Sequence, residues 1–109
     1  VRLYGVSDHA SPSGNIVFNC AIRSNRPGTD TYAAHSTTGE QAITLTPATQ
    51  NRPVSAVTSA ITINGTVAEF AELEGSCEVN ASSTTSAQLT DFFLRAEALV
   101  QLSVNSWSD

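Results

Sequence analysis

The sequence lacks lysine and methionine altogether. Its basic residues are all arginines, and there are five of them: Arg2, Arg23, Arg26, Arg52 and Arg95. Ten carboxylates outnumber them, so the formal net charge is −5. This balance excludes a protein that binds nucleic acid through a broad basic surface.

Long apolar runs are also absent. No stretch of 18 consecutive apolar residues occurs, so the sequence predicts no membrane-spanning helix. We find no signal-peptide pattern at the start of the chain. The residue Val1 fits the removal of an initiator methionine as well as the prior removal of a longer leader, and we leave both open.

Cysteine is scarce, with only Cys20 and Cys77 in the chain. Two cysteines 57 positions apart do not have the spacing of a metal site. We favour the interpretation that both are small buried hydrophobic residues on strands. The alternative is a disulfide formed in an oxidising compartment.

No pattern of catalytic residues is visible. Asp8, His9 and His35 could be combined with a serine on paper, but their order and spacing match no nucleophile motif. No activated nucleophile and no paired acid and base can be identified. We therefore predict that the protein is not an enzyme and that it uses no cofactor and no metal.

What is present indicates one small folded domain. The chain has 109 residues, of which 40% are hydrophobic, which is enough for a single modest core. We expect residues 1–83 to form an antiparallel meander of five to six strands. Alternation is clearest over residues 16–23 and 41–46, where apolar side chains occupy every second position. We expect residues 84–109 to form a C-terminal helix and tail.

The strongest local signal is Asn64-Gly65. A two-residue hairpin turn of type I′ needs positive φ at both positions, which asparagine and glycine tolerate best. Alternating residues flank this pair on both sides. The sequence therefore predicts a hairpin in which residues 54–63 pair with residues 67–79.

The helix is predicted over about residues 86–102. Thr85 and Gln88 fit a capping box in front of an apolar run with a period of 3.6 residues. Leu89, Phe92 and Leu99 lie on its main apolar stripe, and a second stripe is offset from the first. The predicted fold class is thus α+β, an antiparallel meander sheet followed by one helix.

This arrangement leaves the sheet incompletely covered. A helix of about 25 Å cannot cover five or six strands that lie about 4.8 Å apart. We therefore predict an interlocked homodimer in which each helix covers part of both sheets. The expected dimer interface consists of Leu89, Phe92, Phe93, Leu94, Ala96, Ala98, Leu99 and Leu102.

Two stretches carry a resemblance to a known family. Residues 41–63, QAITLTPATQNRPVSAVTSAITI, look like two central strands joined by a loop that reads Ala48-Thr49-Gln50-Asn51-Arg52. Residues 77–100, CEVNASSTTSAQLTDFFLRAEALV, look like a last strand, a polar break and a C-terminal helix. In this order of elements the chain resembles the coat proteins of single-stranded RNA bacteriophages, the leviviruses.

The resemblance implies a capsid protein. Such a protein forms dimers, builds an icosahedral shell in the bacterial host cytoplasm and packages single-stranded RNA in the virion. Its inner sheet face would bind an RNA hairpin. Carried over to this sequence, the RNA-binding candidates are Thr44, Thr46, Asn51, Arg52, Thr58 and Thr62.

Other features favour simpler interpretations. Threonine is common on solvated sheet faces because of its β propensity, and a loop arginine is usually a solvated charge. Glu72, Glu74 and Glu78 are expected on the same polar side, where they would repel phosphate. The acidic net charge also differs from that of the coat family, whose RNA-packaging members are usually neutral to basic.

A second function therefore stays open beside the capsid. In this alternative the chain is a secreted or cell-surface β-sandwich module, similar to a pilin or adhesin domain. Cys20 and Cys77 would then form a disulfide, and an acidic, lysine-free surface rich in serine and threonine would be ordinary. The predicted helix argues against this alternative, because such sandwiches rarely need one.

Overall fold

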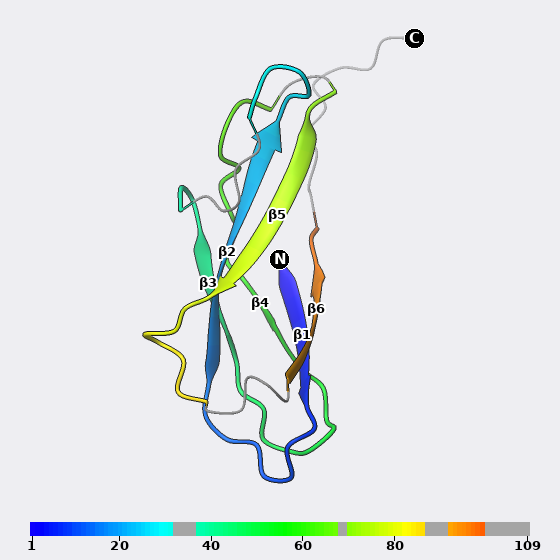
Figure 1. Cartoon of the computed structure of the whole chain (residues 1–109), viewed down its shortest axis with the longest axis vertical. Coiled ribbons are helices and arrows are strands. Elements are labelled where there is room, and N and C mark those ends of the chain that lie inside the picture. Colours follow the sequence, from blue (N-terminus) through cyan, green and yellow to red (C-terminus); the bar gives the residue numbers. More distant parts are fainter. Residues whose placement is uncertain (32–36, 68–69, 87–91, 100–109) are drawn as a thin grey trace.

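The structure is a computed structural model that describes residues 1–31, 37–67, 70–86 and 92–99. These residues form six strands and no helix (Figure 1). The strands are β1 (Arg2–Ser7), β2 (Ile16–Asn25), β3 (Gln41–Leu45), β4 (Val54–Val57), β5 (Glu72–Val79) and β6 (Phe92–Glu97). No helix that could cross a membrane is found in this part of the chain.

The strands form two antiparallel sheets of three strands each. The first sheet has the order β4-β1-β6, and the second has the order β3-β2-β5. The chain passes from one sheet to the other four times, so neighbours in space are often distant in sequence. Strand β1, for example, pairs with β6, and Leu3 lies opposite Ala96.

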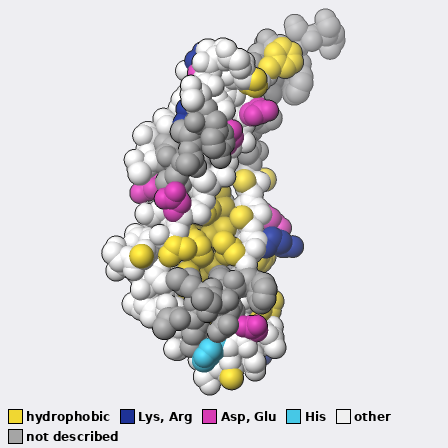
Figure 2. Space-filling view, viewed as in Figure 1, with side chains coloured by type: hydrophobic (Ala, Val, Ile, Leu, Met, Phe, Trp, Pro, Cys, Tyr) yellow, Lys and Arg dark blue, Asp and Glu magenta, His cyan; other side chains and the backbone are white. Residues whose placement is uncertain are grey.

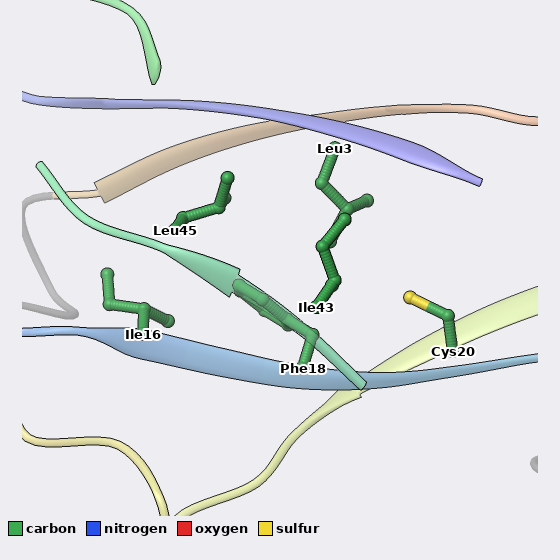
Figure 3. Close-up of a cluster of buried hydrophobic side chains, with 6 residues drawn as sticks. All are labelled: Leu3, Ile16, Phe18, Cys20, Ile43 and Leu45. Atoms are coloured by element: carbon green, nitrogen blue, oxygen red, sulfur yellow. The ribbon is translucent and has the colours of Figure 1, made fainter. Parts of the chain in front are cut away.

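The core lies between the two sheets. Leu3 of β1 points toward the second sheet, whose strands β2 and β3 send apolar side chains to meet it (Figure 3). Leu3 and Ile16 are completely buried. The buried cluster consists of Leu3, Ile16, Phe18, Cys20, Ile43 and Leu45. The strands predicted in residues 16–23 and 41–46 are therefore confirmed, and β3 shows the expected alternation of buried and exposed residues. In β2 the second face is buried as well, at Val17 and Ala21.

Strand β2 is the central strand of the second sheet. It is longer than its two partner strands, and where they end its backbone forms hydrogen bonds with loop residues. Its Val17 N–H donates to the Thr84 hydroxyl at 3.0 Å, past the end of β5. Toward its other end, the Ser24 N–H donates to the Asn64 carbonyl at 2.8 Å, past the end of β3. The molecule measures 56 × 29 × 19 Å. Strand β2 runs along most of the long axis, and its upper part lies beside β5 (Figure 1).

A disulfide joins Cys20 of β2 to Cys77 of β5. The two residues lie directly opposite each other on neighbouring strands, with their Cα atoms 4.0 Å apart. Cys20 is fully buried in the core, and Cys77 packs against it. Our preferred interpretation of two free buried cysteines was wrong, and the alternative, a disulfide, is found.

The predicted α+β fold class was also wrong. Residues 92–97, placed in the helix, form β6 along the whole length of β1. The rest of that helix, at residues 87–91 and 100–102, lies outside the described residues. The physical reason is that pairing with six residues of β1 outweighs intrinsic helical propensity. Residues 94–97 are good helix formers, but differences in propensity are worth less than about 1 kcal/mol per residue. Together with Ala96, the residues Leu94 and Ala98 of the second apolar stripe give the every-second-residue pattern of a strand.

The predicted Asn64-Gly65 hairpin was wrong as well. Strands β4 and β5 do not pair, because β4 lies beside β1 and β5 lies beside β2. Asn64 instead forms an isolated parallel bridge with Arg23. Gly65 does adopt a positive φ, of 93°, and a Cβ atom at this position would lie only 3.0 Å from the Ser24 carbonyl oxygen. The glycine serves close approach to β2 rather than a hairpin.

The single meander sheet covered by a partner's helix is replaced by two layers within one chain. The β4-β1-β6 sheet takes the place that we had assigned to the helices of a dimer. The geometric argument for a partner therefore no longer holds. Self-association itself stays a prediction.

Candidate functional site

Strand β6 is at the edge of its sheet, and its two faces have different chemistry. The outward face carries Arg95, which lies opposite Tyr4 of β1. The Arg95 guanidinium sits over the Tyr4 ring, 4.3 Å from its centre. The Tyr4 hydroxyl donates to a Glu97 carboxylate oxygen at 3.2 Å, and Arg95 donates to the other oxygen at 3.0 Å. These contacts satisfy the charges on this face with one another.

The inward face of β6 is apolar but incompletely covered. Leu94 lies opposite Gly5, and Ala96 lies opposite Leu3, so both belong to the face that turns toward the second sheet. Leu3 is fully buried, whereas Leu94 remains 45% exposed. The sandwich is closed where β3 contacts β4 and β1, and it is open on the side of β5 and β6.

The opening is a groove of about 330 Å³ between the two sheets. We call it the β5/β6 groove, and its walls are Val1, Leu3, Gly75, Ser76, Cys77, Leu94, Ala96, Glu97 and Ala98. A Cβ atom at Gly75 would meet no atom within 4 Å, so the β5 wall is open at this position. The groove is mostly apolar, so its chemistry suits an apolar segment and not a charged substrate.

Apolar surface continues past the groove. A second hollow, of about 470 Å³, is lined by Val1, Val57 and Leu99 together with polar neighbours. Leu99 is 95% exposed and Val57 is 60% exposed. Figure 2 shows hydrophobic side chains gathered midway along this face of the molecule, at the level where Figure 1 places the N-terminus. Contiguous apolar surface of this kind marks an interaction site more often than a catalytic one.

The predicted RNA-binding residues lie on β3 or just after it, in the loop before β4 and in the segment after β4. Thr44 and Thr46 are exposed at β3 and just beyond it, and Thr46 donates to the Asn15 side-chain oxygen at 2.8 Å. Asn51 and Arg52 are exposed in the loop before β4. Thr58 is buried, and its hydroxyl accepts a hydrogen bond from the Val1 amino group at 2.9 Å.

The remaining candidate, Thr62, is exposed in the segment between β4 and β5. Thr44 and Thr46, like Asn51 and Arg52, are near neighbours in sequence, and Thr58 is the one buried residue among the six candidates. RNA binding by these residues stays a prediction. Thr58 has a structural role that accounts for it without RNA, since its backbone N–H also donates to the Val1 carbonyl.

The acidic residues of β5 do not form a metal site. Within the described part of the chain, no group of three or more histidine, cysteine or carboxylate side chains could hold a metal ion. Glu74 accepts a hydrogen bond from the Asn25 amide at 3.2 Å. The alternation that placed Glu72, Glu74 and Glu78 on one side of their strand is consistent with their register against β2.

The predicted dimer interface is only partly described. Leu94, Ala96, Ala98 and Leu99 are exposed, at or just after β6, while Leu89 and Leu102 lie outside the described residues. Phe92 and Phe93 begin the strand. These residues were predicted as the apolar stripes of a helix, but residues 92–97 form a strand, and their role in a dimer stays a prediction. The signal that would have found a strand is the alternation of Leu94, Ala96 and Ala98 with Arg95 and Glu97.

Comparison with known proteins adds no relative. No protein-family model, no curated protein and no solved structure was found to match this chain. The disulfide, the core and the β5/β6 groove are therefore the features that bear on function.

Proposed function

We propose that this chain is a β-sandwich module of a secreted or cell-surface protein, with a structural and interacting role rather than a catalytic one. The observation that carries the proposal is the disulfide between Cys20 and Cys77. Disulfides of this structural kind persist in oxidising compartments and are rare in reducing ones. Both cysteines of the chain are used in it, and no free thiol remains.

The energetics of a small domain support the same proposal. A chain of this size buries a limited core, and the buried cluster here has six residues. The disulfide closes a loop between residues 57 positions apart and so lowers the entropy of the unfolded chain. This stabilises the folded state by about 4 kcal/mol at 25 °C. Small extracellular domains commonly gain their margin of stability in this way.

The surface also agrees with an extracellular module. The chain has no lysine, and its polar positions are dominated by serine, threonine, asparagine and carboxylates. The ordered charges we find are local pairs, such as Arg26 with Asp30 at 2.8 Å. Such a surface offers no broad basic field for nucleic acid.

The coat-protein hypothesis stays a prediction. The helix that carried much of the resemblance is replaced by β6 over residues 92–97. Its test remains particle formation: purified protein that elutes as particles with strong absorbance at 260 nm would support a capsid and contradict the present proposal.

The test of the proposal is the redox state of the protein taken from its own source. Free thiols are alkylated before lysis, and the protein is then digested without reduction and measured by mass spectrometry. We expect a peptide pair linked through Cys20 and Cys77 and no alkylated cysteine. Alkylation of both cysteines would show that the protein resides in a reducing compartment, and the proposal would be wrong.

A further inference from the structure

Strand β6 presents a free edge beside the open β5/β6 groove. In the order β4-β1-β6, it has a neighbour on one side only among the described strands. Its other edge therefore carries backbone N–H and C=O groups that can pair with an additional strand. A strand added there would turn one face into the groove and the other toward solvent.

The groove defines what such a strand needs. Its wall on the β6 side is formed by Leu94 and Ala96, and its wall on the β5 side includes Cys77 and the open position at Gly75. The inward face of the added strand must be apolar at every second residue. The outward face can be polar, because it continues the solvated face that carries Arg95 and Glu97.

The chain itself contains a segment with this pattern, directly after the described residues. Val100, Leu102 and Val104 alternate with Gln101, Ser103 and Asn105. The six residues contain no charge, no proline and no glycine, and two of the three apolar residues are β-branched valines. Such a sequence fits a half-buried strand.

We propose that residues 100–105 of a second copy of this chain add to β6 and fill the β5/β6 groove. Val100, Leu102 and Val104 enter the groove, and the three polar residues face solvent. This is recognition by strand addition, in which backbone hydrogen bonds supply affinity and alternate side chains supply specificity.

Residues 100–105 of a second copy can pair with β6 more readily than the same residues of its own chain. To pair with its own β6, the segment would have to reverse direction within Ala98 and Leu99, directly after Glu97. A two-residue reversal between paired strands needs positive φ, which asparagine, aspartate and glycine adopt far more readily than alanine or leucine. Two copies can exchange these segments reciprocally and close a symmetric dimer.

The experiment measures the mass of the full chain by sedimentation or light scattering over a range of concentrations up to about 100 μM, where even weak dimers populate. The variant Leu102→Lys changes the inserted face, and Leu94→Lys changes the groove wall. The matched control Ser103→Lys adds the same charge to the solvent face of the same segment. We expect the wild type to dimerise, the first two variants to dimerise at least about tenfold more weakly, and the control to match the wild type.

Mixing the two weakened variants tests the exchange directly. Leu94→Lys retains an intact segment, and Leu102→Lys retains an intact groove. Mixed in equal amounts, they should recover a heterodimer that neither forms alone, with one segment–groove contact. A wild type that is monomeric at every concentration would overturn the proposal, and so would a dimer that Leu102→Lys leaves unchanged or a mixture that recovers nothing.

This inference goes beyond the proposed function and fails separately from it. Circular dichroism of each variant checks that the sandwich is folded. The disulfide is measured on the same samples, so a protein with an intact disulfide that does not dimerise contradicts the exchange alone.

Discussion

At the scale of single residues, the shortest ion pair described joins Arg26 and Asp30, in the turn after β2. Asp30 accepts hydrogen bonds from the Arg26 backbone N–H at 2.9 Å and from the Arg26 guanidinium at 3.0 and 2.8 Å. The guanidinium, more than any other group, lowers the pKa of the Asp30 carboxyl from 3.8 to about 2. The turn is therefore held by the ionised form of Asp30.

This lowered pKa predicts a pH dependence of stability. Because the folded pKa lies below the unfolded value, the contribution of Asp30 is fully present above about pH 4. It is lost as the pH falls from about 4 through about 2. Denaturant unfolding across this range should show the loss in the wild type and a smaller loss in Asp30→Asn. Equal slopes in the wild type and in Asp30→Asn would contradict this role of Asp30.

A second prediction at this scale concerns two glycines with positive φ. A Cβ at Gly65 would approach the Ser24 carbonyl to 3.0 Å, whereas one at Gly28 would meet nothing within 4 Å. Gly28→Ala should cost about 1 kcal/mol for the left-handed backbone alone. Gly65→Ala should cost more, because β2 must also move. Urea unfolding of both variants measures the difference, and equal costs would show that the approach to Ser24 is unimportant.

At the scale of elements, β6 depends on cross-strand contacts with β1. Tyr4 and Arg95 are direct partners in the register, and their side chains are stacked. Such pairs are the unit by which neighbouring strands stabilise each other. A helix over the same residues would not place Arg95 beside Tyr4 in this way.

A double-mutant cycle tests this contact. Tyr4→Ala and Arg95→Ala should show a coupling of about 0.5 to 1 kcal/mol in the free energy of unfolding, which is typical of an exposed cation–π pair. The control cycle combines Tyr4→Ala with Arg23→Ala, which lies in the other sheet and should show no coupling. A Tyr4–Arg95 coupling near zero would argue against the pairing of β1 and β6.

In the second sheet, the disulfide between Cys20 and Cys77 holds β2 and β5 together. The variant with Cys20→Ala and Cys77→Ala should lose about 4 kcal/mol of stability, the value expected for closing a loop of this length. Adding a reductant should lower the wild-type unfolding midpoint to a similar extent and leave the double variant unchanged. A wild type insensitive to reductant under denaturing conditions would mean that the disulfide is not formed.

Sequence patterns identified some elements and missed others for a physical reason. Strands β2 and β3 were predicted because apolar side chains occupy every second position in both, and these side chains form the core. The burial of Val17 and Ala21 on the other face of β2 was not foreseen. Strand β6 was missed because Phe92, Phe93, Ala96 and Leu99 also fit a helical period, and short apolar segments satisfy both patterns. The Asn64-Gly65 pair correctly predicted a positive φ at Gly65. The predicted pairing of the segments before and after it was wrong, because β4 pairs with β1 and β5 pairs with β2.

At the scale of the whole molecule, the sandwich depends on contacts between residues far apart in sequence. Leu3 meets apolar side chains of β2 and β3 from the opposite sheet (Figure 3). Which strands share a sheet cannot be derived from local patterns, because β1 pairs with β4 and β6 rather than with β2. For the same reason the β5/β6 groove was not foreseen, since its walls come from three separate parts of the chain.

The core makes a direct prediction about stability. Leu3 is fully buried between the sheets, so Leu3→Ala should cost about 2 to 5 kcal/mol in the free energy of unfolding. Leu73→Ala is the matched control, because Leu73 is 39% exposed in β5 and its truncation should cost clearly less. Chemical denaturation of both variants would contradict the two-layer core if their costs were the same.

The central claim is that one chain closes a two-sheet β sandwich in which residues 92–97 pair with β1 as a strand. Nuclear magnetic resonance of the full, oxidised protein tests it most directly, through backbone chemical shifts and contacts between backbone protons. The account predicts strand-type shifts over Phe92–Glu97 and cross-strand contacts that pair Leu3 with Ala96 and Gly5 with Leu94. Helical shifts over these residues, with contacts between positions three and four apart and none to β1, would contradict it.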